Sequence, residues 1–154
     1  MFEYKDFNDF TRLLGYHKVR YLLIGGYAVA FHGYPRYTKD LDIWIAPDEV
    51  TAEKMMAVLN DFGFGSLGLG KIDFLKDGMF IQLGQEPIRI DIVIQKQFFE
   101  TAWRSRINHP SGDHQVHFVS LKYLLELKAL AGRPQDIADI SKLAKKEKKK
   151  RNRK

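Results

Sequence analysis

Residues 21–46 read YLLIGGYAVAFHGYPRYTKDLDIWIA, and this stretch decides the fold that we expect for the whole chain. It begins with an apolar strand that ends at Ile24, followed by Gly25 and Gly26, a short helical pattern and a turn. A second strand then carries Asp40 and Asp42. Because side chains alternate between the two faces of a strand, both carboxylates share one face. The opposite face is apolar and carries Leu41, Ile43 and Ile45.

This pattern indicates a metal and phosphate site. Two carboxylates on one strand face can share divalent cations, and proteins hold Mg²⁺ with one or two carboxylates plus substrate phosphates. Gly25 and Gly26 precede a helix start, where backbone N–H groups and the helix dipole attract phosphate. Taken separately, a Gly-Gly turn and an Asp-x-Asp pair also occur in plain turns and on solvated strand edges. The prediction therefore depends on their combination.

A third carboxylate strengthens the combination. Residues 88–94 read IRIDIVI, and their strict alternation predicts a strand with an isoleucine face and a second face that carries Asp91. A carboxylate on a strand that looks central needs a partner or a function. The alternative is a surface Asp91 that pairs with Arg89.

These residues resemble the nucleotidyltransferases of the DNA polymerase β type, in their small bacterial form. The shared pattern is an apolar strand, a Gly-Gly turn, a short helix, Asp-x-Asp on the next strand and a third Asp on a later strand. The residues around the short helix are similar to the abortive-infection-toxin-like branch and to its relatives that modify antibiotics. The matching residues are Gly25, Gly26, Ala28, His32, Gly33, Arg36, Thr38, Asp40, Leu41 and Asp42.

The resemblance implies an α/β (α+β) nucleotidyltransferase fold, with a small mixed β-sheet packed by helices and a short C-terminal helical segment. It implies that Asp40, Asp42 and Asp91 are catalytic and hold two ions of Mg²⁺ or Mn²⁺. A purely structural alternative exists near the C-terminus, where Asp136 could cap its own helix and Arg133 could bind the preceding carbonyls. The nucleotide-binding residues that the resemblance implies are Gly25, Gly26, Arg36, Thr38, Lys128, Arg133 and Asp136.

The implied activity is the transfer of a nucleoside monophosphate from a nucleoside triphosphate, such as ATP, to a hydroxyl acceptor, with release of pyrophosphate. The acceptor stays open between an RNA or tRNA end, a protein and a small molecule such as an antibiotic. A non-catalytic alternative is a nucleotide- or RNA-binding partner in a toxin–antitoxin-like module. The presence of all three carboxylates and both glycines favours the enzyme.

Length and composition predict one domain. The chain has 154 residues, of which 45% are hydrophobic and none is cysteine, so it can build a single core and uses neither disulfides nor thiolate metal sites. The N-terminus lacks the basic and apolar regions of a signal peptide, and no apolar run reaches the roughly 18 residues of a membrane span. We therefore expect a cytoplasmic protein without membrane contact.

The net charge of +6 is concentrated at the C-terminus. Residues 145–154 read KKEKKKRNRK, which contributes +7 and leaves −1 for residues 1–144. We expect one nucleotidyltransferase domain over residues 1–144, whose C-terminal helices span 120–144, followed by a basic disordered tail. The alternative for the tail is contact with RNA.

Apolar spacing and turn residues place the other elements. A turn is expected over 108–113, and Ser120 is expected to cap the helix that follows it. Helices are expected over 6–16, 47–59, 97–105 and 121–132 and from 134 onward, and strands over 20–24, 72–75, 79–83, 88–94 and 115–119.

Overall fold

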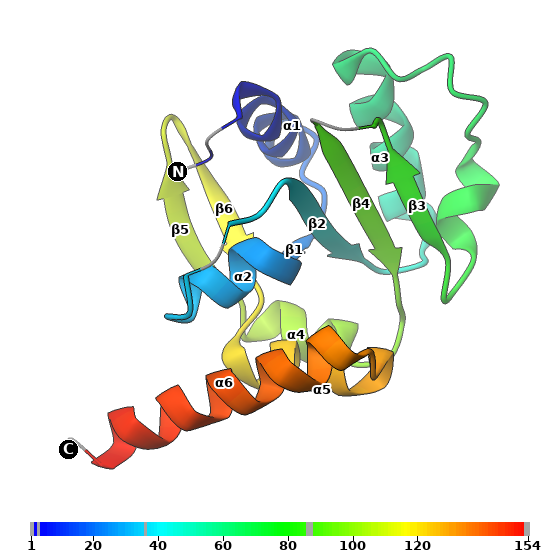
Figure 1. The fold of residues 1–154 in the computed structure, drawn as a ribbon. Helices are drawn as coiled ribbons and strands as arrows, with labels where there is room; N and C mark the ends of the chain where they lie inside the picture. Colours follow the sequence, from blue (N-terminus) through cyan, green and yellow to red (C-terminus); the bar gives the residue numbers. More distant parts are fainter. Residues whose placement is uncertain (1, 3, 36, 86–87, 153–154) are drawn as a thin grey trace.

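A computed structural model describes residues 2, 4–35, 37–85 and 88–152 of the chain. Within these residues, six α-helices, one 3-10 helix and six strands follow one another (Figure 1). The helices are α1 (Lys5–Tyr16), α2 (Gly25–Phe31), α3 (Glu49–Phe62), η1 (Lys71–Leu75), α4 (Phe99–Arg104), α5 (Leu121–Ala131) and α6 (Pro134–Asn152). The strands are β1 (Leu22–Ile24), β2 (Asp40–Ile45), β3 (Phe80–Leu83), β4 (Arg89–Ile94), β5 (Ile107–Ser111) and β6 (His114–Phe118).

The described strands form one mixed sheet in the order β3-β4-β2-β1-β6-β5. Strand β2 lies antiparallel to β1 and parallel to β4, and the β3–β4 and β5–β6 pairs are antiparallel. Strands β2 and β4 therefore lie side by side although about 45 residues separate them in the sequence. The predicted α/β fold with a small mixed sheet is confirmed.

Helices pack against the sheet and bury residues on both of its faces. Helices α1 and α3 pack together, with the rings of Phe10 and Phe62 in edge contact at 5.2 Å. On the acid-bearing face of β2, Trp44 is fully buried against Phe99 of α4, and its indole N–H donates to the Gln95 carbonyl at 2.9 Å. Helices α5 and α6 pair with each other beside α4 (Figure 1). Asp40 and Asp42 thus lie near the start of a strand whose two faces are covered.

Two local predictions are wrong. Residues 72–75 form part of η1 instead of a strand, because the Asp73 carboxylate accepts the Gly70 N–H at 2.8 Å and closes a helical turn. The segment 108–113 is mostly strand β5, and the turn is confined to Gly112 and its neighbour. Pro110 is tolerated in β5 because this strand lies at the edge of the sheet.

Helix α6 runs to Asn152, across most of the segment for which composition predicts a disordered tail. Lysine, arginine and glutamate are good helix formers, so a helix that is anchored at its first turns can continue through them. Ser120 occupies the position before α5, but its side chain makes no capping hydrogen bond. None of the described helices combines the length and the apolar character that crossing a membrane requires.

Candidate active site

The parallel pairing of β2 and β4 brings the acids together. Asp42 and Asp91 are direct partners across the two strands, and Asp40 is the partner of Arg89. Partners in a parallel pair point to the same face of the sheet, so three carboxylates meet there. Asp91 is 2% exposed, which excludes the alternative of a solvated surface acid.

Arg89 nevertheless makes the ion pair that the alternative included. One of its terminal guanidinium nitrogens, Nη2, lies 2.8 Å from Asp40 Oδ2 and 3.0 Å from Asp91 Oδ2. The other oxygen of Asp91, Oδ1, is buried and has no N–H or hydroxyl donor among the described residues, while the Asp42 carboxyl, when protonated, hydrogen-bonds to the Asp91 carboxylate. A buried carboxylate oxygen without a donor is costly in a folded protein, and it marks a position where a ligand could bind.

The crowding of carboxylates changes their protonation. Burial, together with the charges of Asp91 and Asp40, raises the pKa of Asp42 to about 7. Burial also raises the pKa of Asp91, against the opposing effect of Arg89. Like charges held close together disfavour ionisation, and a bound cation would relieve this repulsion.

The three carboxylates have the right chemistry to bind a divalent cation, but their side chains are not arranged around a common point. Hard cations prefer carboxylate oxygens, and Asp91 Oδ1 offers a free one. In the described part of the chain, no three histidine, aspartate or glutamate side chains already surround a common point as metal ligands. The guanidinium of Arg89 lies between Asp40 and Asp91 and pairs with one oxygen of each.

Gly25 allows Asp42 to approach the start of α2. Its φ is +66°, in the left-handed region that favours glycine. A Cβ built on Gly25 would lie 2.1 Å from Asp42 Oδ2, which is impossible for any real side chain. The glycine for which the sequence predicts phosphate binding leaves room for a carboxylate.

A cavity of about 640 Å³ joins the acids to helices α5 and α6. Its sheet side is formed by Gly25 and the three carboxylates, and its helical side includes Leu124 and Leu127. Seven of the ten residues predicted for the site line this one cavity. They are Gly25, Asp40, Asp42, Asp91, Lys128, Arg133 and Asp136.

The other three predicted residues lie differently. Gly26 is buried within α2 and is not part of the cavity wall. Thr38 donates its hydroxyl to the Asp40 carbonyl at 3.2 Å, so it holds the backbone before β2. Arg36 lies outside the described residues.

Lys128 is a buried link between α5 and α6. Its ammonium lies 2.9 Å from Asp139 and 3.5 Å from Asp136, and all three side chains are almost fully buried. Asp136 also accepts the backbone N–H and the guanidinium of Arg133, at 3.2 and 2.7 Å. The predicted capping role of Asp136 is therefore present. The Lys128 ammonium is held by two carboxylates, which makes it a structural clamp in this state.

Sequence reasoning missed Arg89, Gln135 and Asp139 as residues of the cavity wall. Asp139 follows Asp136 by one helical turn, so the i, i+3 spacing in α6 was the available signal. Gln135 donates to Asp139 at 2.9 Å and completes the cluster. Arg89 carried a signal too, because it stands two residues before Asp91 on the same strand face.

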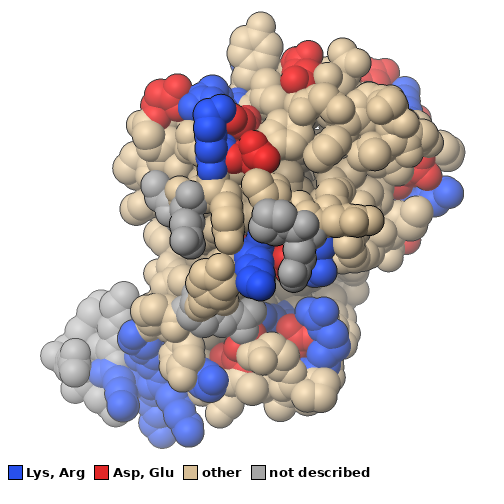
Figure 2. Space-filling view, turned by 45° about the horizontal axis from the view of Figure 1, so that its top comes forward, with Lys and Arg blue, Asp and Glu red and all other residues tan. Residues whose placement is uncertain are grey.

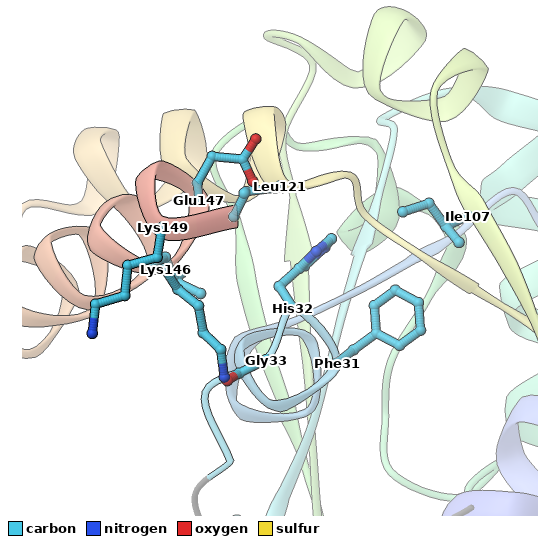
Figure 3. Close-up of a pocket in the computed structure, with 9 residues that line it drawn as sticks. Phe31, His32, Gly33, Ile107, Leu121, Lys146, Glu147 and Lys149 are labelled. Atoms are coloured by element: carbon cyan, nitrogen blue, oxygen red, sulfur yellow. The ribbon is translucent and has the colours of Figure 1, made fainter. Parts of the chain in front are cut away.

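A second cavity, of about 830 Å³, lies between the end of α2 and the C-terminal half of α6. Figure 3 shows Lys146 reaching from α6 to the Gly33 carbonyl, to which it donates, while Lys149 extends away from His32. Glu147 supplies the one carboxylate among the described lining residues. This cavity therefore lacks the paired carboxylates that a divalent cation needs.

The fold has a counterpart among solved structures. A crystal structure of a Thermotoga maritima protein, described as a putative nucleotidyltransferase, superposes with a TM-score of 0.56 and covers 91% of both chains. The fold is of the nucleotidyltransferase type. The two sequences are 16% identical, so the similarity concerns the fold alone. No protein-family model and no curated protein matches the sequence.

Gly25→Ala tests the contact between α2 and Asp42. We expect the free energy of unfolding to fall by about 1–2 kcal/mol from the left-handed backbone alone, and further because Asp42 must move. The matched control is Gly15→Ala in α1, where an added Cβ meets nothing within 4 Å; it should stabilise by roughly 0.5–1 kcal/mol. Urea unfolding in EDTA measures the free energy of unfolding of both variants. Equal changes in the two variants would contradict the contact between Gly25 and Asp42.

The raised pKa of Asp42 predicts a pH dependence of stability. The unfolded chain releases this proton near pH 4, whereas the folded protein keeps it up to about pH 7. The free energy of unfolding should therefore decrease as pH rises through this window. Asp42→Asn removes the effect. In EDTA at pH 8, its free energy of unfolding should therefore exceed that of the wild type by on the order of 1–3 kcal/mol. Parallel pH profiles of the two proteins would contradict the assignment.

Lys128→Met tests the clamp between α5 and α6. Two buried carboxylates would lose their shared cation, which should lower the free energy of unfolding by about 3–5 kcal/mol. Lys145→Met, at an exposed position of α6, should change it by less than about 0.5 kcal/mol. Thermal and urea unfolding report the difference, and a loss below about 1 kcal/mol for Lys128→Met would show that the clamp is unimportant.

Proposed function

We propose that this protein is a metal-dependent nucleotidyltransferase, which moves a nucleoside monophosphate from a nucleoside triphosphate to a hydroxyl acceptor. One observation carries the proposal. Asp42 and Asp91 face each other across adjacent parallel strands, with Asp40 beside them, on the wall of a cavity large enough for a nucleotide. The fold similarity supports the same class of reaction.

In the proposed reaction, the acceptor oxygen forms a bond to the α-phosphorus, and the bond from that phosphorus to the β-bridging oxygen breaks. Pyrophosphate leaves, and the acceptor proton passes to a carboxylate. Asp91 suits this step, because its Oδ1 has no N–H or hydroxyl donor among the described residues and burial raises its pKa. Two divalent ions, held by the three aspartates, would supply charge stabilisation for the attacking and leaving oxygens.

The helical wall of the cavity has a positioning role in this proposal. Arg133, whose side chain is largely exposed, lines the cavity together with Lys128 and Gln135. A guanidinium suits phosphate because it donates two parallel hydrogen bonds. We assign Arg133 to the triphosphate and Lys128 to the support of Asp136 and Asp139.

The acceptor is best sought among polyanions. Figure 2 shows basic side chains gathered on the C-terminal part of α6, at the lower left of the view. The exposed lysines there favour contact with an RNA phosphate backbone and disfavour a cationic antibiotic. They are Lys142, Lys145, Lys146, Lys148 and Lys149.

A non-catalytic nucleotide- or RNA-binding domain is the second candidate, within a toxin–antitoxin-like module. Arg89 favours it, because a guanidinium between Asp40 and Asp91 already neutralises part of the charge that would bind metal. The two candidates differ in turnover. The enzyme releases pyrophosphate when it is given Mg²⁺, a nucleoside triphosphate and an acceptor, and the binding domain does not.

Asp91→Asn tests the enzyme directly. The substitution removes a charge and a proton acceptor with little change of shape, so we expect pyrophosphate release to fall by about a hundredfold or more. The measurement uses each labelled triphosphate with Mg²⁺ and total RNA, which also identifies donor and acceptor. Asp113→Asn, an exposed acid paired with Arg12, serves as the matched control and should keep the wild-type rate. Wild-type turnover in Asp91→Asn would reject the proposed role of Asp91.

A further inference from the structure

Arg89 occupies a special position among the basic residues of the cavity. It opens β4, and its Cα is the direct cross-strand partner of Asp40. The same nitrogen atom contacts carboxylates on both strands, Asp40 on β2 at 2.8 Å and Asp91 on β4 at 3.0 Å. The guanidinium therefore bridges the two strands at the point where their acids converge.

This bridge uses carboxylate oxygens that a divalent cation bound by the same acids would need. Asp40 and Asp91 are two of the three proposed metal ligands, and each presents its Oδ2 to Arg89. An arginine and a metal ion cannot occupy the same space between the same oxygens, and both are cations that repel each other. Arg89 does not contact Asp91 Oδ1, which is buried and has no N–H or hydroxyl donor among the described residues.

We propose that Arg89 is a built-in counter-cation that competes with the divalent cation for Asp40 and Asp91. The inference rests on the proposed function, because it takes these acids to be metal ligands. Without metal, Arg89 offsets the repulsion among three carboxylates. When the cation binds, the guanidinium has to leave the oxygens that it contacts now.

The side chain has a route out. Arg89 is about one-third exposed, with 32% of its side chain accessible to solvent, and it lines the same cavity as Gly25 and Arg133. It can therefore rotate into the cavity without crossing the apolar core. A bound triphosphate there would give the guanidinium new oxygens, and arginine binds phosphate as well as carboxylate.

Two consequences follow. A free divalent cation binds weakly, because it must displace Arg89 without offering the guanidinium another partner. A nucleoside triphosphate strengthens metal binding, because its phosphates accept Arg89 as it leaves the carboxylates. The two ligands are thus coupled through one side chain, and by linkage each raises the affinity for the other.

The first experiment measures Mn²⁺ binding without nucleotide, by isothermal titration calorimetry and by the paramagnetic signal of bound Mn²⁺. Arg89→Gln removes the competing charge, so we expect its affinity for Mn²⁺ to exceed that of the wild type by about tenfold to a hundredfold. The matched control is Arg12→Gln. Arg12 also bridges two carboxylates, Asp9 and Asp113, at 2.8 and 3.0 Å, but it lies outside the cavity and should leave affinity unchanged.

A second measurement keeps the test valid if Arg89→Gln folds poorly. Arg89→Lys keeps the positive charge, so its Mn²⁺ affinity should stay within a few fold of the wild type. Adding a non-hydrolysable triphosphate should raise the Mn²⁺ affinity of the wild type and of Arg89→Lys more than that of Arg89→Gln. Thermal unfolding in EDTA and in Mn²⁺ confirms that each variant is folded, and Mn²⁺ should stabilise Arg89→Gln most.

The outcomes separate this inference from the proposed function. If Arg89→Gln binds Mn²⁺ no tighter than the wild type while the wild type releases pyrophosphate, the inference is wrong and the enzyme stands. If neither protein binds Mn²⁺ and neither releases pyrophosphate, both are wrong. Tighter binding by Arg89→Gln that is lost again in Arg89→Gln/Asp42→Asn supports the competition at the three acids.

Discussion

The in-register parallel pairing of β2 with β4 is the constraint on which the rest of the site depends. It places Asp42 directly beside Asp91 and Asp40 beside Arg89, in a part of the sheet that helices cover. A slip of one residue would turn Asp91 to the opposite face and replace it with an isoleucine. The register is fixed because the alternate positions of both strands are fully buried, including Ile43 and Ile92.

Concentrating like charges in this way has an energetic cost, and the surrounding residues reduce it in different ways. Arg89 partly neutralises two carboxylates, Gly25 makes room for a third, and Asp42 keeps its proton up to about pH 7. The helical wall solves the same problem differently, since Lys128 is shared by two buried acids. Strain of this kind is typical of functional sites, where charge is held ready for a ligand.

The elements around the acids could be predicted from local sequence periodicity. The alternation in residues 40–45 and 88–94 gave both acid strands, and the Gly25 turn gave the start of α2, because these patterns depend on near neighbours. The strand predicted over 72–75 was wrong because a single side chain, the Asp73 carboxylate, closes a helical turn on Gly70. The turn predicted over 108–113 was wrong because the pairing of β5 with β6 outweighs the turn preference of these residues.

The three aspartates of the candidate site were easier to predict than the residues that surround them. The resemblance suggested Lys128 and Asp136, but no local pattern shows that Lys128 is clamped between Asp136 and Asp139. Arg89 could be paired with Asp91 from their spacing, yet its contact with Asp40 needs the strand register. Contacts between distant segments are therefore the part that the structure adds.

The most direct test of the account is a crystal structure with Mn²⁺ and a non-hydrolysable nucleoside triphosphate, in which anomalous scattering locates the metal. We predict Mn²⁺ bound by Asp40, Asp42 and Asp91, with the guanidinium of Arg89 withdrawn from both strands and turned toward the phosphates. Metal bound elsewhere, with Arg89 still between Asp40 and Asp91, would contradict it.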